Sequence, residues 1–157
     1  TVNKNVNGLS RVFARCSTVE TLILDDVNRR LLKVVRQILG DVPIGRLEVR
    51  QFIFIDGKDI VKLAATHNID SITIETDDFA IMRSLKDMRT FFLNIIRSGV
   101  QRLEIWEMKT HANWIFGKER GYWDGLQEKL ACNEFKIQVS DVVGQNGEDI
   151  HSLLIVP

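Results

Sequence analysis

The sequence predicts an α/β fold in which a mostly parallel sheet carries helices on one face and exposes the other. Three observations support this prediction. Short apolar stretches alternate with helical patterns along the chain, as in parallel strands joined by helical crossovers. Within each strand, apolar residues alternate with polar ones, which indicates a sheet with one face in water. The apolar pairs begin at Leu22, Leu47, Ile72, Leu103 and Ile137, so the spacings are 25, 25, 31 and 34 residues.

The first half of the chain is expected to contain three helix–strand units. Residues 27–40 place apolar side chains at helical spacing, and Gly40 follows as a glycine in the left-handed conformation would. Pro43 then prevents the helix from continuing into the next strand. The expected elements are helix 9–16, strand 21–24, helix 27–40, strand 46–49, a short amphipathic helix at 59–67 and strand 71–74.

The second half is expected to repeat this order with longer connections. Asp77 and Asp78 give the next helix an acidic start, which favours its dipole, and the helix stops near Gly99. Asn146 and Gly147 indicate a hairpin turn before the last strand. The remaining expected elements are strand 102–106, helix 122–131, strand 135–139 and strand 152–156.

Repeat spacing distinguishes two parallel architectures. The first two spacings fall within the range of about 20–29 residues that is typical of leucine-rich repeats. A doubly wound sheet would have nearly continuous apolar strands, because both of its faces are buried. We therefore expect a leucine-rich-repeat-like open solenoid with a C-terminal β-hairpin cap. No linker divides the chain, so residues 1–157 are expected to form a single domain.

Composition narrows the classes of partner. Lys+Arg and Asp+Glu both number 21 among 157 residues, which argues against nucleic-acid or polybasic membrane binding. No apolar run approaches the roughly 18–20 residues that span a bilayer. Cys16 and Cys132 are interpreted as packed thiols of a reducing compartment, so the expected location is cytoplasmic or nuclear. The absence of an initiator Met suggests a fragment of a longer chain.

The sequence carries none of the common catalytic signatures. The sequence has no phosphate-binding glycine loop and no nucleophile elbow. His67, His111 and His151 lack the spacing of paired zinc ligands. The sequence therefore predicts no catalytic residues, no cofactor and no metal, and indicates that the protein is not an enzyme.

The strand register predicts which side chains occupy the open face. Equivalent positions of parallel strands become lateral neighbours, so Asp25, Arg50 and Glu75 should form a row of alternating charge. Lys136 should lie beside Arg102, and Trp106 beside Arg102 and Glu104 has the composition of a binding hot spot. The predicted partner-binding residues are Arg46, Glu48, Arg50, Glu75, Arg102, Glu104 and Trp106.

Two stretches, 88-MRTFFLNIIRSGVQRLEIWEM-108 and 43-PIGRLEVRQF-52, resemble nematode F-box-associated domains of the FBA type 2 or FTH-like kind. The Asn146-Gly147 turn before a final apolar strand is similar as well. The resemblance implies a protein–protein interaction module, the substrate-recognition domain of an F-box (SCF-type) ubiquitin ligase receptor. It also implies a Skp1-like adaptor and a cullin, reached through an F-box upstream of this chain.

Two other functions remain open. A small-ligand-binding or enzymatic parallel α/β domain would need a pocket at the strand ends, near Asp25, Asp77 or Glu107. A structural subunit domain of a larger assembly would have its open face or an end strand covered by another chain.

Overall fold

Helices and strands alternate along the chain as the periodicity predicts. The structure is a computed structural model that describes residues 10–25, 27, 29–50, 57–76, 84–108, 125–143 and 149–157. The strands are β1 (Val19–Leu24), β2 (Ile44–Val49), β3 (Ser71–Thr76), β4 (Arg102–Met108), β5 (Lys136–Val143) and β6 (Asp149–Val156). The helices are α2 (Arg29–Leu39), α3 (Gly57–His67), α4 (Leu85–Arg97) and α5 (Leu126–Leu130), and a helical turn covers residues 10–13.

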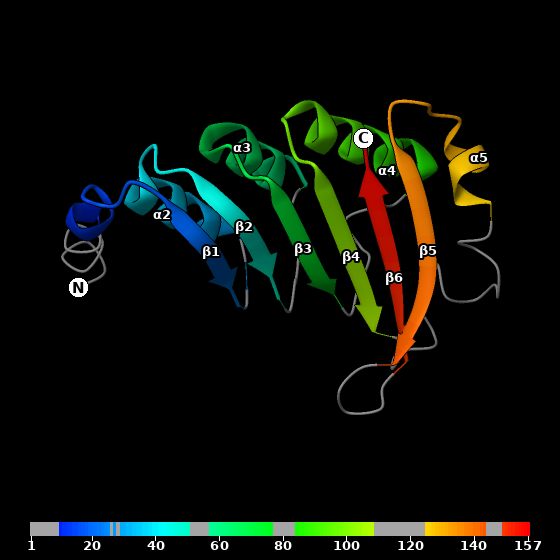
Figure 1. Ribbon diagram of the computed structural model, residues 1–157, viewed down its shortest axis with the longest axis horizontal. Coiled ribbons are helices and arrows are strands. Elements are labelled where there is room, and N and C mark those ends of the chain that lie inside the picture. The colour runs from blue at the N-terminus through cyan, green and yellow to red at the C-terminus, as the bar shows by residue number, and fades with distance from the viewer. Residues whose placement is uncertain are drawn as a thin grey trace.

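All six strands belong to one sheet with the order β1-β2-β3-β4-β6-β5. The pairs β1–β2, β2–β3 and β3–β4 are parallel, whereas β6 runs antiparallel to both of its neighbours. Helices α2, α3 and α4 lie along one face of the sheet, and α5 lies next to β5 (Figure 1). The prediction of an α/β fold with a mostly parallel sheet is therefore confirmed.

The core lies between the sheet and the helices. The predicted inward pairs of β2, β3 and β4 are fully buried, with exposures between 0% and 1%. Phe92 of α4 packs edge-on against Phe135, which precedes β5, with ring centroids 5.7 Å apart. Because burial of each large apolar side chain contributes about 1.5–3 kcal/mol, this layer dominates the stability of the fold.

Local signals define the helix ends, and the two predicted ones are at the C-termini. The Ser84 hydroxyl accepts a hydrogen bond from the Asp87 N–H at 3.1 Å and so caps the N-terminus of α4. Gly99, with φ of 97°, follows that helix, and Gly40, with φ of 59°, follows α2. Both helices therefore end at the glycines that the sequence indicates. The acidic pair Asp77–Asp78 lies outside the described residues.

The C-terminal strands differ from the expected order in space. β6 lies between β4 and β5, so Lys136 pairs with Val156 and is separated from Arg102 by a whole strand. Val139, predicted to face the core, is 38% exposed because β5 is the edge strand. The hairpin itself is confirmed by the antiparallel pairing of β5 with β6. Its turn at Asn146-Gly147 lies outside the described residues.

Among the helices that the structure describes, none combines the length and the apolar character needed to cross a membrane.

Candidate functional site

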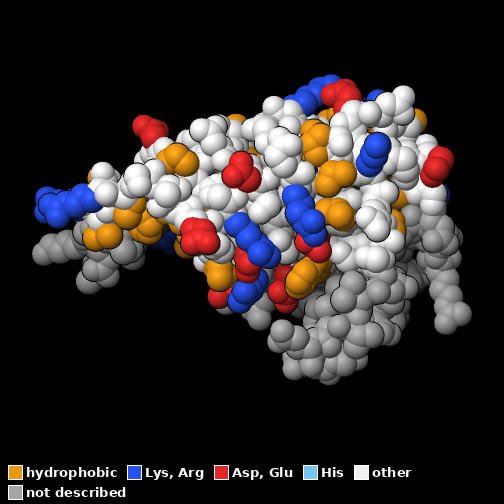
Figure 2. Space-filling view, viewed as in Figure 1, with side chains coloured by type: hydrophobic (Ala, Val, Ile, Leu, Met, Phe, Trp, Pro, Cys, Tyr) orange, Lys and Arg blue, Asp and Glu red, His pale blue; other side chains and the backbone are white. Residues whose placement is uncertain are grey.

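The open face of the sheet brings the predicted partner-binding residues together. The register places Glu48 beside Thr73, and Thr73 beside Glu104, in one row across β2, β3 and β4. A second row pairs Glu75 with Trp106. In Figure 2, charged side chains of both signs gather over the middle of this face. The predicted lateral neighbours are therefore confirmed for the row of Glu48, Thr73 and Glu104 and for the pair of Glu75 and Trp106.

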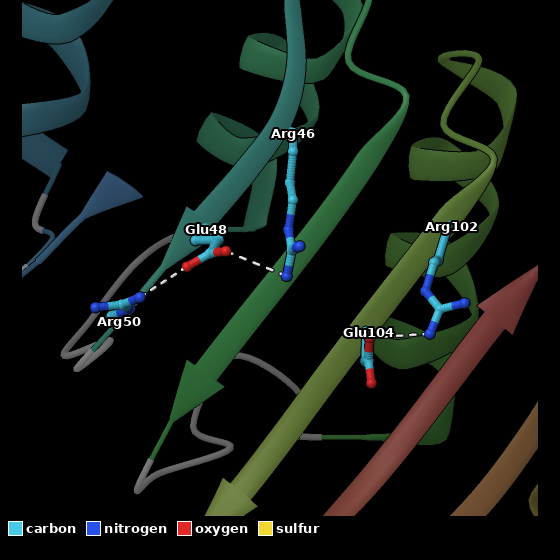
Figure 3. Close-up of polar contacts among 5 residues, drawn as sticks. All are labelled: Arg46, Glu48, Arg50, Arg102 and Glu104. Carbon is cyan, nitrogen blue, oxygen red and sulfur yellow. Dashed lines mark hydrogen bonds and ion pairs between the residues drawn. The ribbon is translucent and has the colours of Figure 1, made fainter. Parts of the chain in front are cut away.

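A pair of arginines binds the Glu48 carboxylate from both sides. Arg46 Nη2 lies 3.1 Å from Glu48 Oε1, and Arg50 Nη2 lies 2.8 Å from Glu48 Oε2 (Figure 3). The Glu48 side chain is only 17% exposed, whereas the arginine side chains are 49% and 45% exposed. The hydrogen bond from Arg50 to Glu48 raises the Arg50 pKa, and the charges of Glu48, Asp25 and Glu75 add to this effect.

The same motif recurs on β4, where Arg102 Nη2 lies 3.3 Å from Glu104 Oε2 (Figure 3). In both strands the ion pair joins residues two positions apart on one strand. The expected cross-strand row of Asp25, Arg50 and Glu75 is therefore present only as longer-range electrostatic attraction. Much of the charge on this face is already paired within the chain, so it is weakly available to a charged partner.

Trp106 is less accessible than a binding anchor would be. The residue is only partly exposed, and its Nε1 atom is buried without a hydrogen-bond partner among the described residues. Its neighbour on β6, Ser152, is 5% exposed. The roles of the seven residues in partner binding stay predictions.

A cavity that the sequence did not indicate lies between α3 and α4. Its volume is about 380 Å³. α3 contributes Gly57, Lys58, Val61 and Lys62, and α4 contributes Asp87, Thr90, Phe91 and Asn94. We call this the α3–α4 cavity. The only sequence signal is the spacing of Lys58 and Lys62, which lie four residues apart on one face of a helix, and solvated lysines have the same spacing.

The α3–α4 cavity combines polar walls with an apolar base. The side chains of Lys58, Lys62 and Asn94 are exposed, whereas Phe91 is only 6% exposed. The Asp87 carboxylate accepts a hydrogen bond from the Ser84 hydroxyl at 2.8 Å. Such a site can bind a small ligand, but its described residues offer no nucleophile paired with a base.

The strand-end site that the small-ligand alternative required is not described. Asp77 lies outside the described residues, and so does the side chain of Glu107. Asp25 is exposed and does not line the α3–α4 cavity. The α3–α4 cavity instead lies between helices that begin after β2 and β3.

The cysteines and histidines differ in their environments. Cys132 is buried as predicted, but Cys16 is exposed, because the helical turn at residues 10–13 ends before it. Cys16 borders a second hollow of about 360 Å³ beside the end of α2. His67 is fully buried, and its Nδ1–H donates to the Val42 carbonyl at 2.8 Å. No cluster of three metal-ligating side chains occurs within the described part of the chain.

No family model matches the chain. No curated protein matches it either. Among solved structures, the cofactor-bound protein Rv0187 from MTB is 12% identical with a TM-score of 0.42, covering 98% of this chain and 79% of that one. Sp1610 from Streptococcus pneumoniae, described as a candidate tRNA (m1A22) methyltransferase, is 13% identical with a TM-score of 0.31, covering 93% and 68%. An uncharacterized protein from Listeria monocytogenes serotype 4b is 12% identical with a TM-score of 0.32, covering 96% and 66%.

These comparisons contradict two predictions from the sequence. The chain was expected to be a non-enzymatic protein-interaction module of an F-box ubiquitin ligase receptor. Two of the similar structures are instead described as a cofactor-bound protein and as a candidate methyltransferase. The interaction-module and non-enzyme predictions are therefore withdrawn. The similarity is too low to transfer an activity, so a function must be argued from the residues of this chain. The family resemblance itself stays a prediction.

Proposed function

We propose that this protein is a small-ligand-binding domain of the parallel α/β class and that its site is the α3–α4 cavity. The observation that carries the proposal is the cavity volume of about 380 Å³. Small-molecule sites in proteins are clefts of about 300–1,000 Å³ with an apolar lining and a few converging polar groups. Phe91 and Val61 supply the apolar part here, and Thr90 and Asn94 supply neutral polar groups.

The position of the cavity supports the same function. Its lining comes from two neighbouring helices, from the first residues of α3 and from the first three turns of α4. The space between packed helices is one of the places where small-molecule sites occur in proteins.

We also propose the finer architecture, a leucine-rich-repeat-like open solenoid closed by the β5–β6 hairpin. The sequential order of β1 to β4 and the 25-residue offsets from Thr21 to Arg46 and from Arg46 to Ser71 support it. Helices on one face of the sheet support it as well (Figure 1). The continuous sheet favours a single domain.

A fragment screen tests the proposed site. Amide shifts in two-dimensional NMR spectra should identify fragments that perturb residues 57–62 and 87–94 together. Asn94→Trp fills the cavity and should abolish these shifts, whereas Gln37→Trp, on the exposed side of α2, should leave them unchanged. Both variants should keep the wild-type fold by circular dichroism. Fragments that still perturb the same residues in Asn94→Trp would place the site elsewhere.

A further inference from the structure

We infer that the α3–α4 cavity takes a small organic anion, with a phosphate or carboxylate group attached to an apolar body. This inference rests on the proposed function, because it assigns a ligand class to the same site. It is carried by the arrangement of charged, neutral and apolar side chains around the cavity.

The charges that line the cavity are predominantly positive. Lys58 and Lys62 lie one helical turn apart on α3, and both line the cavity. The opposing carboxylate, Asp87, is already hydrogen-bonded to Ser84 at the N-terminus of α4. Among the described lining residues, two lysines therefore accompany one carboxylate, whose charge is partly offset by the N-terminus of its own helix. This balance favours an anionic ligand over a cationic one.

The remaining lining determines the body of the ligand. Phe91 presents an aromatic surface at the base, and Val61 of α3 stands across from it. The Thr90 hydroxyl donates to the Lys86 carbonyl at 2.8 Å, so toward the cavity it can only accept a hydrogen bond. A ligand made only of charged groups would leave this apolar base unfilled. An apolar or aromatic body of a few atoms fits the base while its anionic group reaches the lysines.

Four probes test the ligand class by NMR titration of the full chain: phenyl phosphate, inorganic phosphate, benzyl alcohol and benzylamine. Phenyl phosphate should perturb residues 57–62 and 87–94 and should bind more tightly than the other three. Lys62→Gln should weaken its binding about fivefold, the magnitude of one exposed charge interaction. Lys33→Gln, the same charge change on the exposed side of α2, should have no effect.

The outcomes separate this inference from the proposed function. Benzyl alcohol or benzylamine binding in the cavity at least as tightly as phenyl phosphate would overturn the anion assignment and keep the site. Inorganic phosphate binding as tightly as phenyl phosphate would overturn the assignment of an apolar body to the ligand. An unchanged affinity in Lys62→Gln would overturn the role of the lysines. No shift at cavity residues with any probe at about 10 mM, a concentration that reveals even millimolar affinity, would overturn both proposals.

Discussion

Gln127 joins α5 to the edge strand β5, and its replacement by Met should destabilise the protein strongly. Its Nε2 donates to the carbonyls of Cys132 at 2.7 Å and Phe135 at 3.0 Å. Its Oε1 accepts the Ile137 N–H at 2.7 Å. Met keeps the length of the side chain but leaves all three backbone groups without this partner. At about 0.5–1.5 kcal/mol for each net hydrogen bond, the expected loss is about 1.5–4.5 kcal/mol.

The assay is thermal and urea unfolding, with Gln138→Met as the matched control on the exposed surface of β5. In a domain of this size, at about 2–4 °C for each kcal/mol, the loss corresponds to a decrease in Tm of about 3–18 °C. Gln127→Met that unfolds within about 1 °C of Gln138→Met would refute the hydrogen-bond argument, since that difference is below about 0.5 kcal/mol.

Gln127→Glu gives a second, pH-dependent test of the same contacts. The carboxylate oxygen that replaces Nε2 faces two carbonyl oxygens, so the pKa of the introduced carboxyl should be raised in the folded state. The penalty is therefore full above the folded pKa, and it decreases as pH falls because the protonated carboxyl can donate one hydrogen bond. Relative to wild type, this variant should gain stability on acidification toward about pH 4, near the ordinary pKa of Glu. A stability difference that does not change with pH would contradict this prediction.

Three further predictions follow from other contacts. Arg97 lowers the Glu134 pKa through a bidentate hydrogen bond, so this contribution to stability is lost as pH falls through the lowered value. Glu134→Gln should flatten that part of the acid unfolding curve, and an unchanged curve would contradict the ion pair. Cys16 should react with a thiol reagent in the native state and Cys132 only on unfolding, as mass spectrometry of labelled peptides can check. Equal reaction rates would contradict the difference in exposure between the two cysteines. Gly45→Ala should lower the Tm, because its Cβ would lie 2.9 Å from a backbone oxygen of β1. Overpacking of this kind costs about 1–3 kcal/mol. An unchanged Tm would show that β1 shifts to make room at no cost in stability.

The parallel part of the fold was predictable because its signals are local. Alternating pairs such as Leu47/Val49 and Ile72/Ile74 specify which face of each strand is buried, and a one-residue slip would expose both members. Glycines at positive φ ended the helices for an equally local reason. These features depend only on side-chain period and backbone conformation, which a sequence displays directly.

The placement of β6 was not predicted, because a hairpin can dock through either of its strands. One signal was present: Leu153, Leu154 and Ile155 form an unbroken apolar run, whereas Lys136 on β5 is typical of an edge strand. The α3–α4 cavity could not be predicted at all, since it depends on how far apart two helices pack. The small-ligand alternative looked for it near Asp25 at the strand ends.

The insertion of β6 between β4 and β5 has a consequence for how the chain is made. β2, β3 and β4 each pair with the strand synthesised just before them, so the sheet can grow as the chain leaves the ribosome. β5 interrupts this order, because the one described strand that pairs with it, β6, is synthesised after it. Until β6 emerges, β5 has no strand to pair with and the outer edge of β4 stays open. During synthesis, that unpaired interval is when this chain is most exposed to pairing with the wrong strand.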